Sequence, residues 1–167
     1  LDDEIMAYTF ARYMAKQGVK SSSILAMNND FGRGAANAYD AAFKKAGIKL
    51  VSTEFFDPGQ ADYRPVLTRL KRAGAETILG VILAGDGAPF MRQFRELGLT
   101  QKVFSRGSLA SAEFLHQVRD NPKVGDGVVE AVCFFFNGSP MVVTFNWATR
   151  TFGALLLIAD DYREVSG

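Results

Sequence analysis

Short apolar runs alternate along the chain with longer segments in which apolar residues recur every three or four positions. The second pattern predicts amphipathic helices over residues 5–15, 35–46, 63–72, 89–97, 112–119 and 141–152. The short runs predict strands over residues 23–27, 48–56, 77–84, 102–105 and 127–136. Four glycines stand at or just beyond the ends of predicted helices, as expected of C-caps: Gly18, Gly47, Gly74 and Gly98.

Strands that alternate with helices predict an α/β fold in which a parallel sheet lies between two layers of helices. The predicted strand over residues 77–84 is almost wholly apolar, which is typical of a strand covered on both faces. We therefore expect a three-layer αβα domain over residues 1–153. Residues 154–167 are expected to form a C-terminal tail, whose apolar cluster at 155–158 would pack on parts of the protein outside this chain.

The composition fits one domain with a substantial core and indicates no charged partner. The chain has 167 residues, 48% of them apolar, and a formal net charge of +1. This balance requires neither nucleic acid nor an anionic membrane as a partner. No apolar stretch is long enough to span a membrane. The first residues are neither a signal peptide nor a start methionine, so we expect that an export signal was removed or that the chain is an excised piece.

Ligands of open parallel sheets bind beyond the carboxyl ends of the strands, and three segments of this chain are expected there. The first is residues 28–34, between a predicted strand and a predicted helix. Asn29 and Asp30 offer hydrogen-bonding side chains, Phe31 offers an aromatic wall, and the helix N-terminal amides would favour an anion. Either Asn29 or Asp30 could instead be the N-cap of the helix.

The second segment is residues 83–89. Gly85 and Gly87 would let the backbone approach a ligand closely, because glycine has no Cβ. Asp86 could accept a hydrogen bond from an ammonium group, or it could cap the helix that follows.

The third segment is residues 105–111. Ser105 and Ser108 could donate hydrogen bonds to a carboxylate. A helix N-cap is the alternative role for the region around Ser108.

The sequence contains no constellation typical of an enzyme, and we expect no catalysis, cofactor or metal. His116 has no partner histidine at metal-ligand spacing, and Cys133 lies in an apolar run without a nearby base. The nucleophile-elbow, zinc-protease and phosphate-loop motifs are missing. A small enzyme of flavodoxin or Rossmann type is the competing hypothesis, which co-purifying flavin or nicotinamide would support.

Three blocks of the sequence, in order, resemble type I periplasmic binding proteins. They are SILAMNNDFGRG at residues 23–34, FFDPGQADYRPVLTRLK at 55–71 and FMRQFRELGL at 90–99. The similarity runs from about residue 5 to 136, and the chain after 136 departs further from the family. The chain is similar to the second lobe of the branched-chain amino-acid-binding family of ABC importers.

This resemblance implies a protein of two similar lobes that trap a small amino acid, organic acid or amide by closing about a hinge. The closed form would dock on ABC permease subunits in the membrane, and the protein would be periplasmic or lipid-anchored at the cell surface. A ligand-sensing regulator or receptor domain with the same fold is the alternative that the sequence leaves open.

The resemblance also assigns candidate ligand-binding positions. Phe31 matches an aromatic position at which the family often places Tyr or Phe against the ligand. Ala84, Gly85 and Asp86 match a ligand-lining segment, although the aromatic residue that some members have there is absent.

Gly107 and Ser108 match a place where some amino-acid binders carry an acid that pairs with the ligand's ammonium group. No acid stands at that point of this sequence. This difference leaves room for an organic acid, an amide or an aromatic acid as the ligand.

Overall fold

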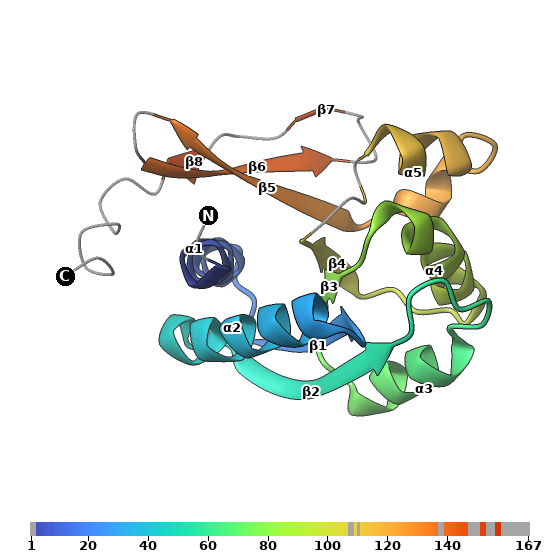
Figure 1. Ribbon diagram of the computed structural model, residues 1–167, viewed down its shortest axis with the longest axis horizontal. Helices are drawn as coiled ribbons and strands as arrows, with labels where there is room; N and C mark the ends of the chain where they lie inside the picture. The colour runs from blue at the N-terminus through green and yellow to red at the C-terminus, as the bar shows by residue number, and fades with distance from the viewer. Residues whose placement is uncertain are drawn as a thin grey trace.

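A computed structural model describes residues 3–106, 109, 111–136, 139–146, 151–152 and 156–157 (Figure 1). The helices are α1 (Asp3–Lys16), α2 (Asp30–Ala46), α3 (Arg64–Ala73), α4 (Ala84–Glu96), α5 (Ala112–Gln117) and a 3-10 turn, η1 (Pro122–Gly125). The strands are β1 (Ser21–Met27), β2 (Lys49–Phe56), β3 (Thr77–Val81), β4 (Lys102–Ser105), β5 (Val128–Phe136), β6 (Ser139–Asn146), β7 (Thr151–Phe152) and β8 (Leu156–Leu157).

The strands form one sheet in the order β2-β1-β3-β4-β5-β6-β7, and β8 pairs with β6. Every pairing among β1 to β5 is parallel. The predicted parallel α/β architecture is therefore confirmed. The carboxyl ends of β1, β3 and β4 lie side by side at one edge of the sheet, because these strands are neighbours with the same direction.

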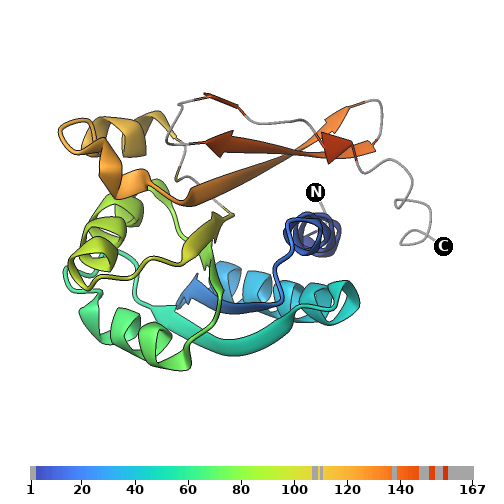
Figure 2. The same cartoon turned by 180° about the vertical axis from the view of Figure 1, so that it is seen from behind.

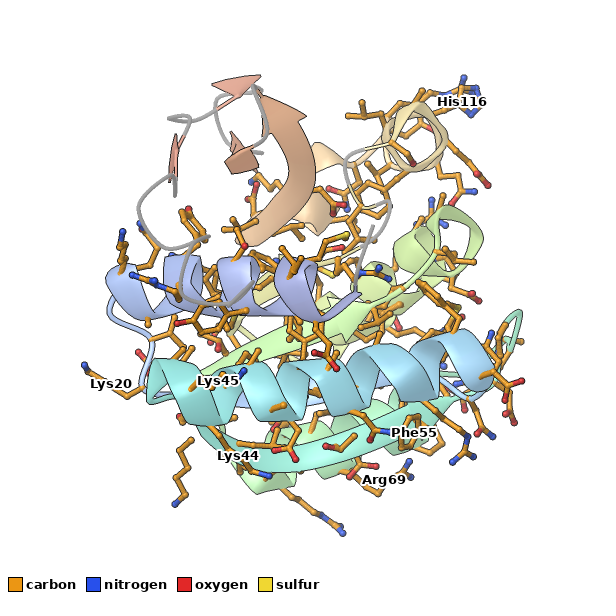
Figure 3. The ribbon with its side chains drawn as sticks, turned by 60° about the vertical axis from the view of Figure 1, so that its left-hand side comes forward. Lys20, Lys44, Lys45, Phe55, Arg69 and His116 are labelled. Atoms are coloured by element: carbon orange, nitrogen blue, oxygen red, sulfur yellow. The ribbon has the colours of Figure 1, made fainter. Side chains whose placement is uncertain are left out.

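Helices cover both faces of the parallel strands (Figures 1 and 2). Successive strand residues point to opposite faces, so Ile78 packs with α3 and α4 while Leu79 packs with α1 and α2. Each buried Leu, Ile or Phe side chain contributes about 1.5–3 kcal/mol relative to an exposed one. Figure 3 shows α1 and α2 running next to each other over their face of the sheet.

Strand β2 is an edge strand of the sheet, and a charged side chain of α3 pairs with it. Arg69 on α3 donates to the Glu54 carboxylate on β2 at 2.6 Å. Figure 3 labels Arg69 near β2. A charged pair along an edge strand discourages further strand pairing, which is a common device in natural sheets.

Two predicted helix starts are wrong by five residues. α2 begins at Asp30 rather than at residue 35, because Asn29 caps it further upstream. α4 begins at Ala84 rather than at Pro89, and β3 ends at Val81. The residues before Pro89 include two glycines, which lower intrinsic helix propensity. In the folded protein this turn is held by tertiary contacts, such as those of Asp86 with Tyr63 and Gly59, which a local sequence pattern does not reveal.

The helix predicted over residues 141–152 is also wrong. Residues 139–146 form β6, which pairs antiparallel with β5 so that Phe136 lies opposite Ser139. Val142, Val143 and Thr144 are β-branched and favour strands over helices. Part of the predicted tail, Leu156–Leu157, pairs with β6. Within the described residues, no helix combines the length and apolar character needed to cross a membrane.

Candidate functional site

The segments that follow β1, β3 and β4 meet at the carboxyl edge of the sheet, where sequence analysis places the candidate site. Phe31, after β1, and Arg106, after β4, are in direct contact across this edge. The Arg106 Cζ atom lies 4.8 Å from the centre of the Phe31 ring. The first and third predicted segments are therefore brought together.

The segment after β1 is organised by a local cap. Asn29 has an extended backbone, with φ −144° and ψ 177°, and its Oδ1 accepts a hydrogen bond from the Gly32 amide at 2.8 Å. Of the two N-cap candidates, Asn29 is thus the one that the structure supports. A Cβ on Gly32 would lie 2.0 Å from the Met27 carbonyl oxygen, so only glycine fits there. Asp30 stands exposed in the first turn of α2.

Phe31 projects from this turn with 44% of its surface exposed, although large aromatic residues are usually well buried. A ring in that position offers an apolar surface at the sheet edge. The same turn is tied to β2 and to the segment after it. Arg33 lies over the Phe55 ring at 5.0 Å, and Asn28 donates to Asp57 at 2.9 Å.

The segment after β3 contains Leu83, which directly precedes α4 and is 49% exposed. Its side chain makes no capping hydrogen bond to α4. Ala84 is half-buried and Gly85 is exposed. The exposed side chain of Leu83 and the exposed backbone of Gly85 follow β3. Because β3 lies between β1 and β4, they lie between the segments that carry Phe31 and Arg106.

Asp86 is buried at 7% exposure and is held from behind by the segment between β2 and α3. Its Oδ1 accepts from the Tyr63 hydroxyl at 2.5 Å and from the Gly59 amide at 2.7 Å. Burial raises the pKa of Tyr63, and the hydrogen bond to Asp86 and the charge of Asp86 raise it further. The predicted contact between Asp86 and a ligand remains a prediction.

Gln93, also on α4, makes a second tie to the same segment. Its Oε1 accepts from the Tyr63 amide at 2.6 Å, and its Nε2 donates to the Ala61 carbonyl at 2.9 Å. The contacts of Gln93 with Tyr63 and Ala61 were not predicted from the sequence, because 30 and 32 positions separate the members of these two pairs.

The segment after β4 begins with Ser105 and Arg106. Ser105 is fully buried, and its hydroxyl has no hydrogen-bond partner among the described residues. Glu130 lies beside Ser105 on β5, is 1% exposed, and accepts from the Leu109 amide at 3.1 Å. Neither Arg106 nor Glu130 was predicted as a site residue from the sequence. The position of Arg106 directly after a strand was the available signal for it.

Two further predicted residues, Gly107 and Ser108, lie outside the described residues. Their roles at the site therefore remain predictions. The N-cap of α5 is Ser111, whose hydroxyl accepts from the Phe114 amide at 3.2 Å.

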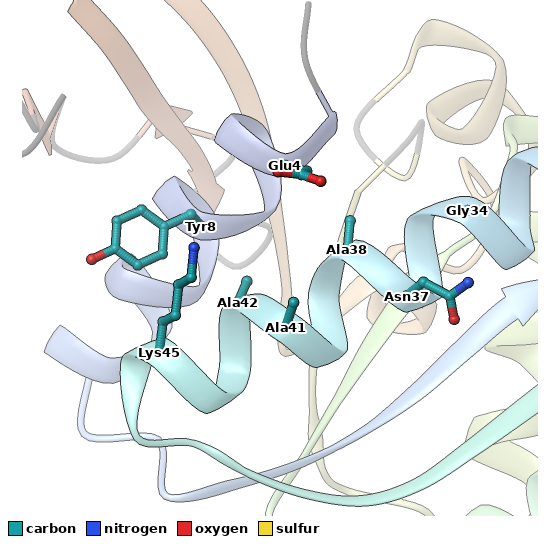
Figure 4. A pocket seen from close by; sticks show the side chains of 8 residues that line it. All are labelled: Glu4, Tyr8, Gly34, Asn37, Ala38, Ala41, Ala42 and Lys45. Atoms are coloured by element: carbon teal, nitrogen blue, oxygen red, sulfur yellow. The ribbon is translucent and has the colours of Figure 1, made fainter. Parts of the chain in front are cut away.

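Two surface hollows include none of the predicted site residues. One, of about 380 Å³, lies between α1 and α2 and is lined in part by Glu4, Tyr8 and Lys45 (Figure 4). The other, of about 450 Å³, is lined in part by Lys71 and Lys102. Across the part of the chain that the structure describes, no group of three or more His, Cys, Asp or Glu side chains could hold a metal ion.

A parallel sheet between two helical layers, with polar and apolar groups at its carboxyl edge, defines one lobe of a type I periplasmic binding fold. Residues 2–154 match the family described as periplasmic binding protein. The chain belongs to this family, whose members are solute-binding proteins and not enzymes.

Named relatives agree with this assignment. The chain is 27% identical over 124 residues to an amino acid binding protein of Pseudomonas aeruginosa, covering 74% of this chain and 32% of the relative. It is 29% identical over 114 residues to Leu/Ile/Val-binding protein homolog 3 of Brucella melitensis, covering 67% of this chain and 31% of the relative. The chain therefore spans about a third of the length of these relatives.

Solved structures show the same fold. The chain superimposes on the crystal structure of a putative branched-chain amino acid ABC transporter from Rhodospirillum rubrum with a TM-score of 0.67 at 24% identity. The match covers 81% of this chain and 38% of that protein. A type 1 periplasmic binding protein from Bordetella pertussis gives a TM-score of 0.71 at 21% identity, covering 79% and 34%.

Proposed function

We propose that this chain is the second lobe of the substrate-binding component of an ABC importer. The complete protein would capture a small amino acid, organic acid or amide between two lobes and deliver it to permease subunits in the membrane. The observation that carries the proposal is the exposed Phe31 ring at the carboxyl edge of a parallel sheet, in a chain of the periplasmic binding protein family. A periplasmic or surface-anchored location follows from this role.

In this proposal residues 1–153 form the lobe and residues 154–167 form a C-terminal tail, of which Leu156–Leu157 pairs with β6. Phe31 supplies an apolar wall, and Asn29 and Asp30 form the turn that presents it. Ala84 and Gly85 line the opposite side through their backbone. Gly107 and Ser108 would complete the site from the third segment.

Asp86 has a different part in the proposal. Because its carboxylate binds Tyr63 and Gly59, it holds the start of α4 in position. Asp86 would then line the ligand site only through its backbone, in the first turn of α4.

Transport would work by hinge closure, and not by chemical conversion of the ligand. Ligand contacts that exist only in the closed state shift the equilibrium toward closure, and the closed form is what the permease recognises. A single lobe makes only part of these contacts. Since each 1.4 kcal/mol lost weakens binding about tenfold, we expect the lobe alone to bind at millimolar concentration or above.

Thermal unfolding of the complete protein that carries this chain tests the proposal. The panel contains amino acids, their amides, and aliphatic and aromatic acids. Aromatic acids belong in it because two Rhodopseudomonas palustris proteins of this fold were crystallised with benzoate and 4-hydroxybenzoate. A ligand at about 100 times its Kd should stabilise the protein by about 2.7 kcal/mol. If no compound in the panel raises the unfolding temperature, the proposal is wrong.

Phe31→Ala is the variant that links binding to this edge of the sheet. Its ring is exposed, so the substitution should change stability little while weakening ligand binding. Leu115→Ala is a matched control, because Leu115 is an exposed apolar residue on α5. Unchanged ligand affinity in Phe31→Ala would show that the ligand binds elsewhere.

A further inference from the structure

We propose that residues 57–63, the bridging segment between β2 and α3, set the size of the ligand that the site accepts. The bridging segment would do so by fixing the distance between the first turns of α2 and α4, which form two walls of the site. Tyr63 is the positioning residue, since it would touch no ligand and would act through α4. This inference rests on the proposed function, because it concerns the specificity of the same site.

Hydrogen bonds join the bridging segment to α4 at two positions. In the first turn of the helix, Asp86 accepts from the Tyr63 hydroxyl at 2.5 Å and from the Gly59 amide at 2.7 Å. About two turns later, Gln93 accepts from the Tyr63 amide at 2.6 Å and donates to the Ala61 carbonyl at 2.9 Å. Because the two attachments lie apart along α4, they fix both the place and the direction of its first turns.

The Tyr63 side chain connects the end of β2 with α4. It is fully buried, and its ring centre lies 5.5 Å from that of Phe56 and 5.9 Å from that of Phe90. Phe56 is the last residue of β2, and Phe90 is on α4. A buried hydroxyl without an acceptor is unfavourable, so positions of α4 that break the bond between Tyr63 and Asp86 are disfavoured.

The other end of the bridging segment is joined to the turn that carries Phe31. The Asn28 amide donates to the Phe56 carbonyl at 2.7 Å, and the Asn28 side chain donates to the Asp57 carboxylate at 2.9 Å. Asn28 directly precedes Asn29, the N-cap of α2. One short segment therefore holds both turns, and the distance between them depends on its shape.

The sequence of the bridging segment makes it stiff. Pro58 fixes its own φ near about −65°, and Gly59 has φ 77°, which favours glycine. The Asp57 amide donates to the Gln60 side chain at 3.0 Å, and the Gln60 amide donates to the Asp57 carbonyl at 3.1 Å. A stiff segment holds the two turns at one distance, whereas a flexible one would let them move apart.

Walls at a fixed distance discriminate between ligands by size. One methylene group more or less in an apolar site changes affinity about 10–200-fold. A site whose walls can move adapts to a larger ligand and loses part of this factor. The ratio of affinities between ligands of different size therefore measures the effect of the bridging segment, which overall stability does not.

The test titrates the complete protein that carries this chain with probes that lengthen by one methylene group at a time. The series are the straight-chain acids from propanoate to octanoate, their amides, the straight-chain L-amino acids from alanine to 2-aminooctanoate, and the aromatic acids from benzoate to 4-phenylbutanoate. Calorimetry gives the affinity ratio between the best member of a series and its neighbours. In the unmodified protein, we expect a ratio of about ten or more in at least one series.

Tyr63→Phe should lower this ratio about threefold or more, because the variant keeps the ring but loses the hydrogen bond to Asp86. Asp86→Asn should keep the ratio, since its side-chain oxygen still accepts from Tyr63 and Gly59. If Tyr63→Phe does not fold, Gln93→Met decides. It removes the second attachment of the bridging segment and nearly preserves the volume of the side chain.

Ile78→Val is the matched control for stability. It removes one methyl group from the buried cluster that contains Tyr63, but it keeps every hydrogen bond of the bridging segment. It should lower the unfolding temperature and leave the affinity ratio unchanged.

The outcomes separate this inference from the proposed function. A ratio that survives in Tyr63→Phe, or that falls as far in Ile78→Val or Asp86→Asn, overturns the positioning role of Tyr63 while ligand capture stands. Equal binding of neighbouring probes by the unmodified protein overturns it as well. Failure of every probe to bind overturns the proposed function, and this inference with it.

Discussion

The first turns of α2 and α4 lie at the same edge of the sheet and contain similar residues, but different parts of the chain hold them. α2 starts with Asp30-Phe31-Gly32, and its N-cap Asn29 binds the Gly32 amide only three residues away. α4 starts with Ala84-Gly85-Asp86, has no side-chain cap, and is tied through Asp86 to Tyr63 and Gly59. One turn is fixed locally, and the other is fixed by tertiary contacts.

This difference has a consequence for the site. The turn at α2 has its own side-chain cap in Asn29, in addition to the hydrogen bond from Asn28 to Asp57 in the segment after β2. The turn at α4 depends on the segment between β2 and α3, so movements of that segment would be transmitted to the backbone at Leu83 and Gly85. Four measurements of the free energy of unfolding test this difference between the two turns.

Gly32→Ala should have the largest effect, because the new Cβ would lie 2.0 Å from the Met27 carbonyl oxygen. We expect the free energy of unfolding, measured in urea, to fall by about 3 kcal/mol, as for severe overpacking against the backbone. Gly34→Ala is the control in the same helix, since nothing lies within 4 Å of its Cβ position. It should stabilise by up to about 1 kcal/mol. Similar effects of the two substitutions would contradict the tight turn.

Asp86→Ala should lower the free energy of unfolding by about 2 kcal/mol, because it leaves the Tyr63 hydroxyl and the Gly59 amide without their acceptor. Asp30→Ala, which changes the exposed acid at the start of α2, should cost less than about 1 kcal/mol. A double-mutant cycle with Tyr63→Phe measures the coupling directly. Additive effects of Asp86→Ala and Tyr63→Phe would show that the two side chains do not interact.

Asn29→Ala should cost about 1 kcal/mol, the usual effect of losing an N-cap side chain. Asn29→Asp keeps an acceptor for the Gly32 amide and should cost much less. Urea unfolding of the three proteins gives the comparison. Equal losses in Asn29→Ala and Asn29→Asp would mean that the cap does not stabilise α2.

The smallest effect concerns alkaline pH. The pKa of Tyr63 is raised above its ordinary value of 10.0 by burial and by Asp86, so the folded state favours the neutral phenol. This stabilisation is complete below the unfolded-state pKa and is lost as the pH rises above it. Between pH 9 and 10.5 it should decline by about 0.8 kcal/mol.

Tyr63→Phe supplies the reference for this measurement, since it lacks the titrating group. The difference in unfolding free energy between the unmodified protein and the variant should shrink over that pH interval. A constant or growing difference would contradict the raised pKa of Tyr63.

Periodicity was enough to predict the α/β class, all five parallel strands and five of the helices. It succeeded where the apolar pattern and the breakers agree, as at α2, which ends in Gly47 with φ 71°. It failed over residues 141–152, where a helix was predicted and β6 is found. An isolated apolar segment rich in β-branched residues has no fixed conformation until a partner strand is available, and β5 supplies that partner.

The candidate site was predictable in its location but not in its contacts. Phe31 could be selected because an aromatic residue after a strand marks the carboxyl edge. Its contact with Arg106 could not, since 75 positions separate the two residues and the contact depends on the order of the strands. Gly107 and Ser108 stay predictions, because they lie outside the described residues.

The residue pattern alone indicates the class of fold and the edge of the sheet at which Phe31 stands, and it left Asn29 and Asp30 as the two candidates for the cap of α2. These features depend on residues a few positions apart, whose preferences act before the chain is compact. Three contacts became apparent only in the folded structure: the hydrogen bond of Tyr63 to Asp86, the position of Arg106 over the Phe31 ring, and the pairing of β6 with β5. Those contacts join distant segments, and they form only once the layers have packed around the sheet.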